Sequence, residues 1–167
     1  MPSRAERVAA ALRLRLELHW PPANPAMLVA LAPIDVVAME WPDDLSAVLV
    51  LRGRGAVIGL NRRHSPGRRH FSFWHEVGHY LLHRTRLERG PLSCSHAPHQ
   101  RRLEPALERE ADSFAVNLMM PAQWVRRSLE DRPSVAALAR DFGVTPRAMQ
   151  RRLRELGLRA LAETAGP

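Results

Sequence analysis

The segment that most restricts how this chain can fold is FSFWHEVGHYLLH, residues 71–83. Its apolar spacing predicts a helix despite Gly78. Because a helix turns roughly 100° per residue, His75 and His79 share one face, about one turn apart. Two imidazoles so placed can chelate one divalent cation, and Glu76 beside them can reach a water on that cation. The pattern H-E-x-x-H therefore predicts a metal site, although three fixed positions can also match by accident.

A site of this kind requires a third protein ligand and leaves a fourth position open for water. The next strongly helical stretch, residues 104–121, contains Glu108, Glu110 and Asp112. Glu108 and Asp112 share a face at a spacing of four residues, whereas Glu110 points roughly 200° away from Glu108. A glutamate ligand from this second helix would complete a His₂Glu site, with Asp112 hydrogen-bonding a ligand histidine.

Two motifs in this part of the chain together resemble a known family. HEVGHYLLH (75–83), followed by EREADSFAVNLMMP (108–121), is similar to the paired motifs of the ImmA/IrrE family of metallo-endopeptidases. An upstream hairpin that carries VIGLN (57–61) also fits the family. The resemblance covers roughly residues 27–158, which is most of the chain.

The resemblance implies roles for the residues at matching positions. It implies three metal ligands, namely His75, His79 and Glu108. It also implies that Glu76 is the general base and that Asp112 forms a hydrogen bond to a ligand histidine. Glu110 as the third ligand remains the alternative. A His₂Glu set favours zinc, with manganese, iron or another divalent metal as alternatives.

The activity that the resemblance implies is that of a zinc-dependent metallo-endopeptidase. The metal lowers the pKa of its bound water towards roughly 7 and polarises the scissile carbonyl, while Glu76 accepts the proton of the water and passes it to the leaving amine. The implied substrate is a helix-turn-helix repressor, cleaved to derepress stress-response or mobile-element genes. The alternative is a DNA-binding or protein-binding regulator that retains the fold, including a toxin–antitoxin or phage partner.

The order of predicted elements indicates an α+β fold. Predicted helices and strands cover residues 4–19, 26–32, 34–39, 47–53, 56–63, 71–83, 104–121, 134–142 and 145–156. We expect a small antiparallel or mixed sheet packed on a zincin-type helix core. We also expect residues 1–130 to form the metallopeptidase core and residues 131–167 to form a C-terminal helical hairpin, resembling a helix-turn-helix, packed on that core.

The C-terminal segment, residues 135–156, has the pattern of a helix-turn-helix with Gly143 in the turn. Its second helix would expose four side chains that can reach phosphates and base edges, namely Arg147, Gln150, Arg151 and Arg154. The alternative is a helical hairpin whose apolar face packs on the core and whose arginines are simply solvated. The resemblance favours this alternative, so DNA is a possible partner but not the favoured one.

All 25 basic residues of the 167-residue chain are arginines, and the formal net charge is +8. An arginine-rich surface can bind a polyanion. Arginines spread along the whole chain are also expected from a GC-rich genome, which is the simpler explanation. The single cysteine, Cys94, excludes an internal disulfide and a four-cysteine zinc site. Cys94 with His96 and His99 is expected to be polar surface, with a second metal cluster as the alternative.

The chain has no pattern typical of a membrane or secreted protein. The longest apolar run, residues 26–39, is interrupted by Pro33 and Asp35 and is too short to span a bilayer. Charged residues interrupt the N-terminal apolar stretch, so it does not resemble a signal peptide. We therefore expect a soluble, cytoplasmic protein.

Several other polar residues lie near the motif or in the loop that follows it. The oxyanion that forms during peptide hydrolysis needs a further donor, for which the candidates are an arginine or His64, His70, His96 and His99. Tyr80 points roughly 100° away from His79 and is expected to face elsewhere. His83 lies about 12 Å from His75 by helical rise, so we interpret it as flanking packing.

Overall fold

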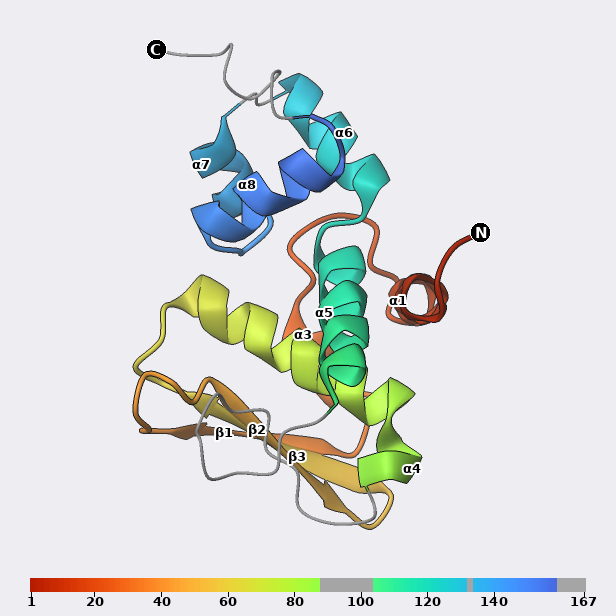
Figure 1. Ribbon diagram of the computed structural model, residues 1–167, viewed down its shortest axis with the longest axis vertical. Helices are drawn as coiled ribbons and strands as arrows, with labels where there is room; N and C mark the ends of the chain where they lie inside the picture. Colours follow the sequence, from red (N-terminus) through yellow and green to blue (C-terminus); the bar gives the residue numbers. More distant parts are fainter. Residues whose placement is uncertain (88–103, 132–133, 159–167) are drawn as a thin grey trace.

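A small sheet and two crossing helices form the body of the protein, and further helices cover one end of it (Figure 1). The computed structural model describes residues 1–87, 104–131 and 134–158. The elements are α1 (Arg4–Arg15), α2 (Pro25–Val29), β1 (Ile34–Met39), β2 (Ala47–Arg52), β3 (Gly55–Asn61), α3 (Pro66–Leu82), α4 (Arg84–Leu87), α5 (Pro105–Met119), α6 (Ala122–Asp131), α7 (Val135–Asp141) and α8 (Pro146–Glu155). This architecture confirms the predicted α+β class. In these ranges no helix is long and apolar enough to cross a membrane.

The sheet is mixed, with the strand order β1-β3-β2. β2 and β3 form the predicted antiparallel hairpin, in which Ala47 pairs with Leu60. The hairpin turns at Gly53, whose φ of +57° is a left-handed conformation that favours glycine. β1 joins the other side of β3 in parallel, so that Ile34 pairs with Ala56. α3 packs across β2 and β3, which places the predicted metal helix directly on the sheet (Figure 1).

α1 ends four residues earlier than predicted, at Arg15 rather than residue 19. Glu17 adopts a left-handed conformation with a φ of 52°. The backbone N–H of Leu18 then donates to the carbonyl oxygen of Arg13 at 2.9 Å, which is a common way for a helix to stop. Leu18 is buried after this turn, so the apolar pattern continues beyond the end of the helix.

α3 begins five residues earlier than predicted, at Pro66 rather than residue 71. The side chain of Ser65 accepts a hydrogen bond from the backbone N–H of Arg68, and Pro66 occupies the first helical position. The serine and proline are therefore start signals of the helix rather than part of the preceding turn. α4 is a single helical turn at positions where the sequence predicts the start of a loop.

α5 crosses α3 at Gly78 (Figure 1). A Cβ atom built on Gly78 would lie 3.0 Å from Cδ1 of Phe114 and 3.2 Å from Cα of Ala111. Both separations are tighter than ordinary packing contacts, so the absence of a side chain allows the two helices to approach closely. This explains why a glycine interrupts an otherwise strong helix pattern.

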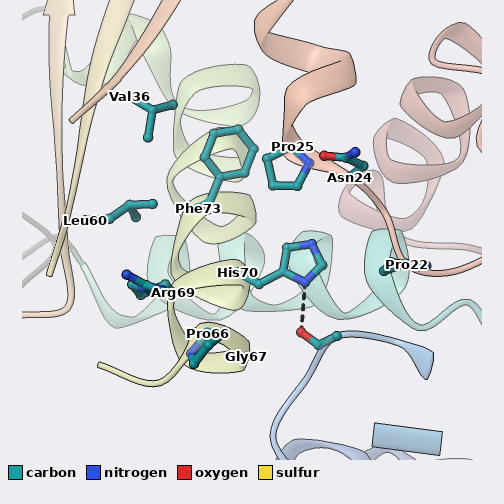
Figure 2. Close-up of a pocket in the computed structure, with 11 residues that line it drawn as sticks. Pro22, Asn24, Pro25, Val36, Leu60, Pro66, Gly67, Arg69, His70 and Phe73 are labelled. Atoms are coloured by element: carbon teal, nitrogen blue, oxygen red, sulfur yellow. Dashed lines mark hydrogen bonds between the residues drawn. The ribbon is translucent and has the colours of Figure 1, made fainter. Parts of the chain in front are cut away.

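α6, α7 and α8 lie at the end of the protein opposite the sheet (Figure 1). Side chains of α8 and α3 connect this end to the crossing helices. The buried Arg152 of α8 donates from Nε to the carbonyl oxygen of Met120 and from Nη2 to Oδ1 of Asn117, both at 3.0 Å. On the other side, Nδ1 of His70 in α3 lies 2.8 Å from the carbonyl oxygen of Gly143, in the turn between α7 and α8 (Figure 2). The division of the chain at residue 130 stays a prediction.

A hollow of about 440 Å³ lies where α2, β1, β3 and α3 meet the α7–α8 turn (Figure 2). Its lining is mostly apolar and includes Pro25, Val36, Leu60 and Phe73. None of the predicted metal ligands lines it, so the hollow is separate from the predicted metal site.

The close crossing of α3 and α5 makes Gly78→Ala a direct test of the packing. Alanine favours a helix over glycine by about 1 kcal/mol, but here the added methyl meets buried Phe114 and the backbone of α5. We expect overpacking to dominate and to lower the free energy of unfolding by about 1–3 kcal/mol in urea denaturation. Leu81→Ala, on an exposed position of α3, serves as the control and should change it by less than about 0.5 kcal/mol. A stabilised Gly78→Ala protein would contradict this explanation.

Candidate metal centre

Three side chains from the two crossing helices bring their ligand atoms together. His75 and His79 lie one turn apart on α3, and Glu108 lies in the first turn of α5. The Nε2 atoms of the two histidines are 3.0 Å apart. Oε2 of Glu108 is 3.2 Å from Nε2 of His75, and Oε1 is 3.6 Å from Nε2 of His79. Each side chain therefore offers one ligand atom to a common point.

These separations fit a tetrahedral metal ion. Zinc binds imidazole nitrogen and carboxylate oxygen at about 2.0–2.2 Å, so two of its tetrahedral ligands lie about 3.3–3.6 Å apart. The two histidine nitrogens are 3.0 Å apart, and the two oxygens of Glu108 lie 3.2 Å from one nitrogen and 3.6 Å from the other, close to that range. Two imidazole nitrogens and a carboxylate oxygen also suit manganese or iron. The group can therefore hold a divalent ion with three protein ligands.

Asp112 lies one turn after Glu108 on α5, and its Oδ1 is 2.9 Å from Nδ1 of His75. A proton on Nδ1 of His75 donates to this carboxylate, which leaves Nε2 of the same ring for the metal. The structure places Asp112 beside a metal-site histidine, which is the contact that the sequence predicts.

His83 contacts the site in a way that was not predicted from the sequence. It is buried at the C-terminal end of α3, and its Nδ1 lies 2.9 Å from Nδ1 of His79. Its Nε2 lies 2.9 Å from Oε2 of Glu110. Glu110 therefore faces His83, while Glu108 faces the two other histidines. The available signal was the spacing: His83 follows His79 by four residues, which places both rings on one face of the helix.

Neighbouring charges and burial shift the pKa values of the clustered groups. Burial by itself lowers the pKa of His75, but hydrogen bonds to Asp112 and Glu108 and the charge of Glu76 raise this pKa to about 10. Burial lowers the pKa of His79, and the nearby positive charge of His75 lowers it further, against the effect of Glu108. Burial raises the pKa of Glu108, yet its contacts with both histidines hold this pKa well below the usual range. These shifts favour a positively charged His75 beside a negatively charged Glu108.

Glu76 follows His75 on α3 and is only 1% exposed. Its charge acts on His75, so the carboxylate lies within the electrostatic reach of the ligand group. A buried carboxylate at this position can exchange a proton with a water in the fourth coordination position. The structure therefore brings the H-E-x-x-H glutamate into the same site as the three candidate ligands.

The oxyanion-donor candidates His64 and His70 contact backbone carbonyl oxygens of other segments. Nε2 of His70 lies 2.6 Å from the carbonyl oxygen of Ala23, and its Nδ1 contacts the α7–α8 turn. His64 precedes α3. Its Nε2 contacts the carbonyl oxygen of Asp43 at 3.1 Å. The two histidines anchor loops.

Two other expectations concern residues beside the site. The hydroxyl of Tyr80 donates to the carbonyl oxygen of Arg54 at 2.8 Å, so this side chain faces the β2–β3 turn, away from the ligands. The remaining candidates, Cys94, His96 and His99, lie outside the residues that the structure describes. The predictions about them therefore stay open.

The predicted polar face of the C-terminal hairpin lies on α8. Its four side chains, Arg147, Gln150, Arg151 and Arg154, are exposed. Arg151 forms an ion pair with Glu155 at 2.9 Å. The opposite side of α8 carries the buried Met149 and Leu153. The helix is therefore amphipathic, with Arg147, Arg151 and Arg154 directed to solvent and Arg152 buried on the opposite side.

Comparison with known families agrees with this geometry. A model of the peptidase M78 family, described as the IrrE N-terminal-like domain, matches residues 32–154. The chain belongs to this family. The match confirms the resemblance that the paired motifs indicate, and membership of the M78 family indicates a metal-dependent peptidase or a related regulator.

The fold of this M78 chain is also found in a solved structure. It is similar to a Mycobacterium tuberculosis transcriptional regulator, with a TM-score of 0.64 and 18% sequence identity. The similarity covers 91% of this chain and 47% of the regulator, so the chain spans about half the length of that protein. At this identity the likeness concerns the fold alone. A comparison with curated proteins gave no match.

The raised pKa of His75 predicts that metal binding releases a proton. With a pKa of about 10, metal-free His75 is protonated at pH 6.5, and its Nε2 must lose that proton to bind a metal. Isothermal titration of Zn²⁺ in buffers of different ionisation enthalpy should therefore show release of about one proton per ion, and affinity should rise about tenfold per pH unit. Asp112→Asn, which removes a charge that raises this pKa, should reduce the release. Binding without proton release would contradict the charge state described above.

Proposed function

We propose that this M78-family protein is a metal-dependent endopeptidase, with zinc as the preferred ion. His75, His79 and Glu108 are the proposed ligands, and Glu76 is the proposed general base. The observation that carries the proposal is the clustering of ligand atoms from His75, His79 and Glu108, with the buried Glu76 next to His75 on α3. The family match supports a peptidase of this kind.

The proposed chemistry divides between the ion and the protein. A divalent ion at this site supplies a Lewis acid for the scissile carbonyl and lowers the pKa of a water. Glu76 accepts a proton from the attacking water and delivers it to the nitrogen of the leaving amine. Glu76 is 1% exposed, so its carboxylate lies out of bulk water. Asp112 orients His75 through the hydrogen bond to Nδ1.

We propose a helix-turn-helix repressor as the substrate, cleaved in the cytoplasm to derepress stress-response or mobile-element genes. The support is the resemblance of the paired motifs to ImmA/IrrE proteins, together with the family match.

Glu76→Gln tests the proposed peptidase. The variant keeps all three ligands, so it should bind Zn²⁺ as the unchanged protein does, but it lacks a proton acceptor. We expect cleavage of a purified helix-turn-helix repressor encoded beside this gene to slow by about 10²- to 10⁴-fold. Glu130→Gln, at an exposed position on α6, is the matched control and should cleave normally. Unchanged cleavage by Glu76→Gln would contradict the proposed role.

A second candidate function is that of a regulator that binds duplex DNA through α8. The observation that favours it is the exposed face of α8, where Arg147, Gln150 and Arg154 follow one another at helical spacing. α8 is also the second helix after a turn at Gly143, the position of the recognition helix in a helix-turn-helix.

The salt dependence of duplex binding tests whether the arginines of α8 bind DNA or are only solvated. Arg147→Ala combined with Arg154→Ala should weaken binding to a mixed-sequence duplex. It should also reduce the slope of log K against log salt by about 0.9 for each phosphate that the variant no longer neutralises. Arg52→Ala, on the sheet at the opposite end of the protein, is the control (Figure 1). If fluorescence anisotropy shows no salt-dependent binding of the unchanged protein, the DNA candidate is rejected.

A further inference from the structure

We propose that His83 and Glu110 form a positioning pair that fixes the ring of His79 and the location of its proton, so that Nε2 of His79 is available to the metal. This inference rests on the metal site proposed above and assigns two residues to it beyond the ligands and the base. It starts from the continuous chain of contacts from His79 through His83 to Glu110, each at 2.9 Å.

Metal binding determines where the protons in this chain lie. If Nε2 of His79 binds a metal through its lone pair, the proton of the neutral ring is on Nδ1. Nδ1 of His79 then donates to Nδ1 of His83, which must accept. The proton of neutral His83 is consequently on Nε2, where it donates to the carboxylate of Glu110. Each donor in the chain meets an acceptor, so this arrangement is internally consistent.

The surroundings hold His83 in one position. His79 and His83 are 0% and 2% exposed, so neither ring can exchange its partner for bulk water without unpacking α3. The backbone N–H of His83 also donates to the carbonyl oxygen of His79 at 2.9 Å, which closes the helix at this residue. The fixed ring of His83 can therefore hold the ring of His79 in one orientation through the contact between their Nδ1 atoms.

Glu110 is itself held by a third element. Nη1 of Arg4, at the start of α1, lies 3.8 Å from Oε1 of Glu110. Nη2 of Arg4 donates to the carbonyl oxygen of Leu82, the last residue of α3, at 3.0 Å. Arg4 therefore links the end of α3 to the glutamate of α5 that faces His83.

The two proposed ligand histidines, His75 and His79, therefore have different hydrogen-bond partners. His75 contacts the carboxylate of Asp112 directly, and the side chain of Asp112 is 41% exposed. His79 instead contacts a buried imidazole, which transmits the influence of the Glu110 carboxylate one residue further. Partners of this kind typically change metal affinity by about 10- to 100-fold when they are removed. We therefore assign His83 and Glu110 as positioning residues.

Three substitutions separate positioning from packing. His83→Leu removes both hydrogen bonds at nearly constant volume. His83→Asn keeps an acceptor close to the position of Nδ1 and so can still hold the proton of His79. Glu110→Gln keeps an acceptor for His83 but removes the negative charge. His64→Leu is the matched control, because it removes another buried histidine that lies before α3.

The measurements do not depend on peptidase activity. Zn²⁺ affinity is measured by competition with a chelator, and the visible absorption of the Co²⁺-substituted protein reports on the geometry of the ligands. The melting temperature of each metal-free variant measures its general stability. Glu108→Ala is included to test the metal site itself.

We expect His83→Leu to lower Zn²⁺ affinity about 10- to 100-fold and to change the Co²⁺ spectrum. His83→Asn should recover most of the affinity, and Glu110→Gln should fall between the two. His64→Leu should change neither the affinity nor the spectrum. If His83→Leu does not fold, the shift caused by Glu110→Gln decides the question in the same assays.

Two results would overturn the positioning role. One is unchanged affinity and spectra in every folded variant of His83 and Glu110. The other is an equal loss in His83→Leu and His83→Asn that follows melting temperature, since that would mean packing alone. If Glu108→Ala also leaves Zn²⁺ affinity unchanged, the proposed metal site fails. If Zn²⁺ affinity falls only in Glu108→Ala, the positioning pair is rejected and the proposed metal site stands.

Discussion

The close approach of α3 and α5 is the constraint on which the metal group depends. Glu108 reaches the two histidines of α3 because the helices cross at Gly78, where no side chain separates them. Distances of 3.0–3.6 Å between the ligand atoms leave little tolerance for a shift of either helix. The sheet beneath α3 and the buried Phe114 on α5 fix this crossing, so the apolar core determines the geometry of a polar site.

Polar groups in the middle of this core are stable because they form a connected network. Burying a histidine or a carboxylate without partners costs several kcal/mol, roughly 2–7 for a neutral polar group. His75 is hydrogen-bonded to Asp112, and His79 contacts His83 on the side away from the ligand group. Two carboxylates of α5 complete these contacts: Asp112 faces His75, and Glu110 faces His83. α5 therefore supplies both Glu108 of the ligand group and the carboxylates that pair with the surrounding histidines.

The sequence predicted the fold class and the placement of His75 and His79 on one helix face, because both depend on local spacing, whereas Glu108 was assigned through the resemblance of the paired motifs. Helical periodicity placed His75 and His79 on one face, and the hairpin followed from two β-branched runs around Gly53. Contacts between segments distant in the chain were harder to predict. The pairing of β1 with β3, the role of Gly78 in packing and the contact of His83 with Glu110 all depend on how elements meet in three dimensions. Helix ends were shifted where capping, rather than periodicity, decided them.

Two arginines contact the C-terminal end of α5. Arg13 from α1 donates to the carbonyl oxygen of Asn117, and Arg152 from α8 donates to the carbonyl oxygen of Met120. Positive charge at this end of a helix is favourable because the helix dipole is negative there. A guanidinium can serve several acceptors at once, which an ammonium cannot do with the same geometry. Two of the 25 arginines thus connect α1 and α8 to the C-terminal end of α5. Through Arg152, the hairpin of α7 and α8 stabilises the helix that carries Glu108.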